Sequence, residues 1–154
     1  MNKAFTIPLN RPMAYAQGAV AVVIGIAAAV YATQGEPMIV LVFGIVATTN
    51  AILAVGGLRS YVTAEGTTLT AQNFYRHQVV ELKGLATAQA APSRGGIVIV
   101  LKNTSGQVVR FILPTNNKAG MQRLIDYLKP YLMASGVNRD KKIDQVIEKY
   151  ASPA

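Results

Sequence analysis

Two uncharged stretches near the N-terminus constrain this chain more than any other feature of its sequence. Residues 14–32 read AYAQGAVAVVIGIAAAVYA, and a second charge-free run covers residues 37–58 after the short link TQGE. With a rise of about 1.5 Å per residue, about 20 apolar residues in a helix cross the hydrocarbon core of a bilayer. The composition agrees, because 51% hydrophobic and 14% charged residues are unusual for a soluble chain of 154 residues. The sequence therefore predicts a two-helix transmembrane hairpin with TQGE at the far interface.

The basic residues around these runs predict the orientation of the hairpin. Lys3 and Arg11 precede the first run, Arg59 follows the second, and the link carries only Glu36. By the positive-inside rule, we expect both ends to lie in the cytoplasm of a multi-pass protein of the plasma (inner) membrane. An alternative stays open, in which residues 1–32 are a cleaved signal peptide. Its apolar run is longer than the usual ~7–15 residues of such a segment.

A stripe of small residues runs along the first predicted span. Ala21, Gly25 and Ala29 recur at every fourth position, which places them on one face of a helix. Small side chains at such a face allow another helix to approach closely. We expect these three residues to form a helix-packing surface for a partner.

Polar side chains gather near the middle of the second predicted span. Thr48, Thr49 and Asn50 follow one another there, and an amide group in hydrocarbon needs a hydrogen-bonding partner. In one interpretation Asn50 bonds within the hairpin and the threonines bond back to their own helix. In the other, the three side chains dock against another membrane subunit. A proton or transport path is not favoured, because neither span contains an ionisable group.

After Arg59 the pattern changes to short β-type segments separated by turn residues, which predicts an antiparallel meander. An amphipathic helix then follows the punctuation at residues 114–117 and is expected to cover the open sheet. The predicted strands are Tyr61–Ala64, Thr67–Ala71, Phe74–Leu82, Leu85–Ala90, Ile97–Leu101 and Val108–Leu113. The apolar face of the helix comprises Met121, Leu124, Ile125, Leu128 and Leu132.

A further periodic segment lies in the C-terminal tail. Ile143, Val146, Ile147 and Tyr150 share one face of a short amphipathic helix. Acidic residues among its lysines weaken attraction to anionic lipid, so we expect this helix to pack on protein. The predicted division is a hairpin with its N-terminal tail over residues 1–58, a sheet domain over 59–133 and a tail over 134–154.

Residues 60–132 resemble bacterial pleckstrin-homology-like (PH-like) domains, which often follow a pair of N-terminal transmembrane helices. The similarity lies in Tyr61–Gly66, in Val79–Leu85 and in the helix after Leu113. The resemblance implies a PH-like antiparallel sheet or barrel closed by a C-terminal helix, acting as an adaptor. Some eukaryotic relatives grip phosphoinositides with basic residues around the first hairpin. The turn at residues 65–68 is Glu-Gly-Thr-Thr without a base, which is a departure from that pattern.

The sequence offers no set of residues for catalysis. It contains no cysteine, and its only histidine, His77, lacks companions with metal-ligand spacing. The seven carboxylates are scattered, and no phosphate-cradling glycine motif is present. We therefore predict no enzyme, no metal, no cofactor, no small-molecule substrate and no nucleic-acid partner.

The formal charge of +8 favours an acidic neighbour. Our leading hypothesis is a non-catalytic accessory or scaffold subunit that docks on an integral membrane protein complex through its hairpin and covers the cytoplasmic face of that complex. The alternative is a sensor or binder of anionic phospholipids, whose head groups contact Arg59, Arg76, Lys83 and Arg94.

Overall fold

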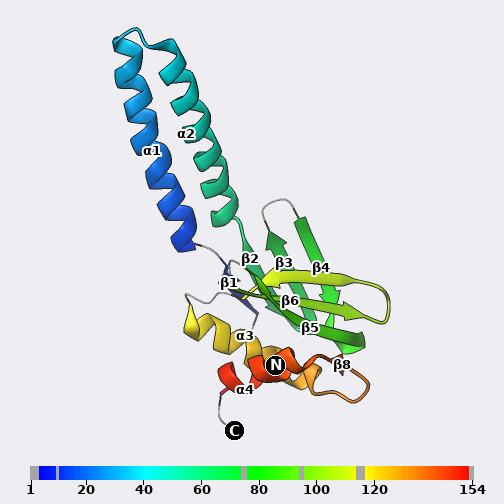
Figure 1. Ribbon diagram of the computed structural model, residues 1–154. Coiled ribbons are helices and arrows are strands. Elements are labelled where there is room, and N and C mark those ends of the chain that lie inside the picture. Colours follow the sequence, from blue (N-terminus) through cyan, green and yellow to red (C-terminus); the bar gives the residue numbers. More distant parts are fainter. Residues whose placement is uncertain (1–3, 10, 74–75, 94–95, 114–116, 153–154) are drawn as a thin grey trace. The chain divides into compact units, whose positions relative to one another are not determined.

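The computed structural model describes residues 4–9, 11–73, 76–93, 96–113 and 117–152 of the chain (Figure 1). The chain divides into two compact units. The helical unit comprises residues 10–59, and the sheet unit comprises residues 1–9 together with residues 60–154.

The helical unit is a hairpin of two long helices, α1 (Arg11–Thr33) and α2 (Pro37–Leu58) (Figure 1). Pro37 suits the first turn of α2 because a proline there removes an N–H that has no partner within the helix. Both helices are long and apolar enough to cross a membrane by length and composition, and only 6% of each apolar window is buried. The prediction of two apolar N-terminal helices is thus confirmed, and α1 begins three residues earlier than expected.

The sheet unit contains two four-stranded sheets, with strand orders β1-β2-β3-β4 and β7-β6-β5-β8. All neighbours are antiparallel except β5 and β8, which are parallel. A 3-10 turn, η1 (Leu82–Gly84), links the sheets. The strands are β1 (Phe5–Pro8), β2 (Tyr61–Glu65), β3 (Thr68–Asn73), β4 (Arg76–Glu81), β5 (Leu85–Ser93), β6 (Gly96–Asn103), β7 (Val108–Ile112) and β8 (Asn138–Arg139).

The predicted meander is confirmed for β2–β4 and for β5–β7, with boundaries that differ by a few residues. The expectation of a barrel is corrected, because the described strands form two separate sheets and no closed barrel. No backbone ladder joins β4 to β7 among the described strands, so each of these two strands lies at the edge of its sheet.

Strand β1 is an element that the sequence analysis did not expect. Residues assigned to the N-terminal tail of the hairpin pair antiparallel with β2, from Phe5 opposite Ala64 to Pro8 opposite Tyr61. The Leu9 N–H donates to the Ser60 carbonyl oxygen at 3.0 Å, directly beyond the last pair. The helical unit is therefore an insertion between two neighbouring strands of one sheet.

Helices α3 (Lys118–Leu132) and α4 (Lys141–Tyr150) complete the sheet unit (Figure 1). Asn117 caps α3 by accepting from the Gly120 N–H at 2.9 Å, and Asp140 caps α4 by accepting from the Ile143 N–H at 2.8 Å. All five residues predicted for the apolar face of α3 are buried, as are Ile143, Val146 and Ile147 of α4. Both helices bury these residues in the core that the two sheets share, so the amphipathic helix of the tail packs on its own domain.

Candidate functional site

A close contact between α1 and α2 lies near the open end of the hairpin and involves residues that the sequence analysis did not select. A Cβ added to Gly57 of α2 would lie 2.8 Å from the Ala14 Cβ of α1, and one added to Gly18 would lie 3.7 Å from the Ala54 Cβ. Ala14 and Ala54 are buried, although most of the hairpin surface is exposed. The spacing of Ala14, Gly18 and Ala21 is helical, and this was the signal that could have identified the contact.

The residues of the predicted small-residue stripe on α1 differ in their exposure to solvent. Ala21 and Gly25 are partly buried, whereas Ala29 is exposed. A Cβ added to Gly25 would meet no atom within 4 Å. The stripe therefore includes Gly25, where an added side chain would meet open space, and ends in the exposed Ala29.

The three predicted polar residues of α2 lie on one exposed or partly exposed stretch of the helix. Thr48 and Thr49 are exposed and Asn50 is partly buried. The Thr49 hydroxyl donates to the Ile45 carbonyl at 2.8 Å, and the Asn50 amide nitrogen donates to the Val46 carbonyl at 2.9 Å. Both side chains thus bond back to their own helix.

Amide side chains join the two sheets along β4 and β7, where no ladder exists between the described strands. The Arg110 N–H donates to Gln78 Oε1 at 2.9 Å, and Asn73 Nδ2 donates to the Arg110 carbonyl at 2.8 Å. Further along, the Glu81 N–H donates to Gln107 Oε1 at 3.0 Å. These bonds provide partners for backbone N–H and C=O groups that are unpaired at the edge of a sheet. They fix the position of β4 relative to β7, and we call this line of contact the seam between the sheets.

The carboxylate at the end of this seam has a shifted pKa. The Thr67 hydroxyl, followed by the Thr68 hydroxyl and Lys83, holds the pKa of Glu81 below its usual value by stabilising the charged form, against an opposing effect of desolvation. Thr68 Oγ1 donates to Glu81 Oε2 at 3.1 Å. Glu81 is thus a charged hydrogen-bond acceptor at neutral pH.

Tyr127 of α3 anchors that helix to the β2–β3 turn. Its hydroxyl donates to the Gly66 carbonyl at 3.0 Å, and its ring meets the Phe5 ring edge-on at a centroid distance of 5.5 Å. Burial, with the neighbouring Tyr131 and Glu81, raises the pKa of Tyr127 to about 12. This arrangement serves the packing of β1 and α3 and provides no reactive group at neutral pH.

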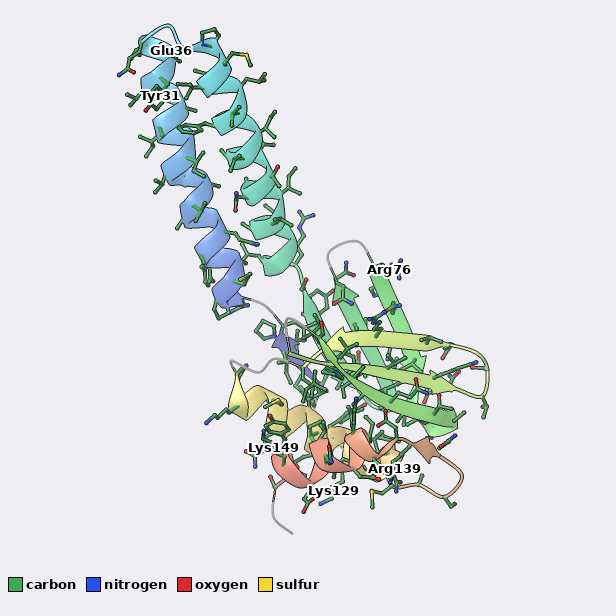
Figure 2. The ribbon with its side chains drawn as sticks, viewed as in Figure 1. Tyr31, Glu36, Arg76, Lys129, Arg139 and Lys149 are labelled. Atoms are coloured by element: carbon green, nitrogen blue, oxygen red, sulfur yellow. The ribbon has the colours of Figure 1, made fainter. Side chains whose placement is uncertain are left out.

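The basic residues predicted to contact lipid do not form one cluster within the sheet unit. Arg76 is the first residue of β4 and Lys83 lies two residues beyond its last residue, Glu81, so the length of the strand, at about 3.3 Å per residue, separates them. Both are exposed, and Figure 2 shows Arg76 at a strand end, away from Lys129 of α3 and Lys149 of α4. Arg59 is exposed at the C-terminal end of α2 in the helical unit. Arg94 lies outside the described residues.

His77 is exposed on β4, and the described part of the chain holds no group of three His, Cys, Asp or Glu residues that could bind a metal ion. No family model, curated protein or solved structure matches this chain.

Proposed function

We propose that the protein is a non-catalytic accessory or scaffold subunit of a larger integral membrane complex. Its hairpin docks on that complex within the bilayer, and its sheet unit covers the cytoplasmic face. The observation that supports this best is the environment of Asn50. Within the described hairpin, its side chain makes one hydrogen bond, to the Val46 carbonyl, and an asparagine offers two N–H donors and a carbonyl oxygen. In hydrocarbon the remaining groups need a partner, and a neighbouring helix provides one.

The pairing of β1 with β2 supports the orientation that we propose. If both helices span the bilayer, the strands before and after the hairpin must lie on the same side in order to pair. The bases at its two ends, among them Arg11 and Arg59, then favour the cytoplasmic side. Cleavage after the first helix would remove β1 together with Ile7, which is buried in the core. We therefore propose a multi-pass inner-membrane protein with cytoplasmic termini and an uncleaved first span.

The order of elements supports a PH-like adaptor domain. Antiparallel strands β2–β7 are followed by the amphipathic helix α3, as the resemblance of this region implies. In a closed barrel a backbone ladder would join β4 to β7. Here hydrogen bonds between side-chain amides and the Arg110 backbone join the two sheets at that position. A bacterial adaptor that binds protein rather than a phosphoinositide also fits the base-free turn after β2.

Purification in a mild detergent tests the proposed function. The full-length protein should elute with its partner complex, and Asn50→Leu should reduce the recovered partner by about tenfold, the equivalent of losing about 1.4 kcal/mol. The matched control is Thr49→Val, because the Thr49 hydroxyl already bonds to its own helix and its loss should leave recovery unchanged. If the native chain and the two variants are all recovered as free monomers, the proposal is contradicted.

A further inference from the structure

The two strands on either side of the helical hairpin are joined to it by short links. Pro8, the last residue of β1, stands three positions before Arg11, the first residue of α1. Tyr61, the first residue of β2, stands three positions after Leu58, the last residue of α2. Three residues of extended chain span at most about 11 Å. Because α2 at about 1.5 Å per residue is about as long as a hydrocarbon core is thick, a spanning α2 brings Pro8 and Tyr61 within reach of the lipid head groups.

Strand register extends this end of the sheet as far as β4. Pro8 lies opposite Tyr61, and Tyr61 lies opposite Gln72. Gln72 in turn lies opposite His77, the residue after Arg76. We call these five residues the hairpin-side row. Arg76 and His77 thus lie at the same end of the sheet as the two links, although they are distant from the links in sequence.

The two ends of this sheet differ in charge. At the end away from the hairpin-side row, Glu65 lies opposite Thr68 and Thr68 lies opposite Glu81. Along β2, about 13 Å separates Tyr61 from Glu65. These two glutamates are the carboxylates of the described strands β1–β4, so the hairpin-side row contains a base and no acid.

Arg76 is available to an external anion. Its side chain is exposed, and among the described residues the ion pair joins Arg139 to Asp144 and leaves Arg76 without a carboxylate. A guanidinium donates two parallel hydrogen bonds to the oxygens of a phosphate group. Tyr61, in the same row, is of a residue type that is enriched at membrane–water interfaces. A base and a tyrosine at head-group depth are complementary to a membrane surface that contains anionic phospholipids.

We propose that the hairpin-side row lies in the head-group layer of the membrane and that Arg76 binds the phosphate of an anionic phospholipid. This inference rests on the proposed function, because it requires that the hairpin spans the bilayer, and it adds a lipid ligand to the protein partner. It also separates the basic residues that were considered from the sequence. Lys83 lies beyond Glu81, at the other end of β4, and does not contact head groups.

Tryptophan fluorescence of the full-length protein tests this inference, because the chain contains no tryptophan of its own. The protein is reconstituted in vesicles of phosphatidylcholine and phosphatidylglycerol, and one of the two lipids bears a quenching spin label near its head group. His77→Trp should be strongly quenched, whereas Lys83→Trp, its exposed control at the other end of β4, should be quenched little. At equal content, labelled phosphatidylglycerol should be enriched about fivefold over labelled phosphatidylcholine at position 77.

Arg76→Gln, added to His77→Trp, should remove this preference for phosphatidylglycerol, whereas Lys83→Gln should leave it unchanged. Gln72→Trp, in the same row, replaces His77→Trp as the reporter if the latter impairs folding. Absent quenching at position 77, equal quenching at positions 77 and 83, equal quenching by the two lipids, or a preference that survives Arg76→Gln would each overturn the inference.

Recovery of the partner complex in mild detergent separates the two proposals. If the complex is recovered but His77→Trp shows no preference for phosphatidylglycerol, the inference fails and the proposed function stands. If the preference is measured and no partner is recovered, the proposed function fails and the lipid contact stands.

Discussion

The insertion of the hairpin between two paired strands leads to a prediction about the sheet unit alone. Leu9 and Ser60 are already hydrogen bonded and follow the register of β1 and β2. Replacing residues 10–59 by Asn-Gly would join them with a two-residue turn, which is the favoured connection for antiparallel strands. We expect this closed chain to be a water-soluble, folded domain that keeps β1 in its sheet.

The contribution of β1 to the stability of the sheet unit can be estimated by comparing this closed chain with a chain that starts at Ser60. Loss of β1 removes Ile7, which is only 3% exposed, and full burial of such a side chain is worth about 1.5–3 kcal/mol. It also removes the edge-on contact of Phe5 with Tyr127, worth about 0.5–1.5 kcal/mol. The expected loss in the free energy of unfolding is therefore about 2–4 kcal/mol.

Urea unfolding followed by circular dichroism measures this difference. With a denaturant slope of about 2 kcal/mol per molar, the truncated chain should unfold at a urea concentration about 1–2 M lower. Ile7→Ala in the closed chain should account for most of the shift, whereas Thr6→Ala, on the exposed side of β1, should have little effect. Equal midpoints for the closed and truncated chains would refute the assignment of β1 to the core.

Three further predictions concern packing, hydrogen bonding and pH. Gly57→Ala should destabilise the hairpin by about 1–3 kcal/mol through overpacking against Ala14, whereas Gly25→Ala should be neutral, and thermal unfolding in detergent compares them. Tyr127→Phe should cost about 1 kcal/mol by removing the bond to Gly66. Because folding raises the pKa of Tyr127 from 10.0 to about 12, the free energy of unfolding should fall as the pH rises from about 10 to 12. Urea midpoints measured across this range should fall for the native chain and fall less for Tyr127→Phe.

Local sequence pattern was sufficient for most secondary structure. A continuous run without charged residues was enough to predict the two apolar helices. Short alternating segments between turn residues were enough to predict β2–β7. The apolar face of α3 follows from spacing alone, since residues three and four positions apart share one side of a helix. These features depend on neighbours within a few residues, so a linear sequence contains them in full.

The candidate site depended on contacts between distant parts of the chain. Asn50 could be selected from sequence because an amide is rare in an apolar run, but its bond to the Val46 carbonyl required the helix geometry. The seam between β4 and β7 could not be predicted, because these two strands lie far apart in sequence. Side-chain hydrogen bonds of Gln78, Asn73 and Gln107, together with the shared core, hold those strands side by side.

The sequence by itself determined that the chain has two apolar helices, an antiparallel meander and two amphipathic helices, because each is specified by local periodicity. The tertiary structure alone decided that residues 5–8 belong to the sheet, since four isolated residues are too short a run to predict a strand and this one forms by pairing with β2. It also decided that the strands form two sheets rather than a barrel. A barrel would need a backbone ladder between β4 and β7, whereas these strands are joined by hydrogen bonds to side-chain amides. No local sequence pattern encodes which of the two forms.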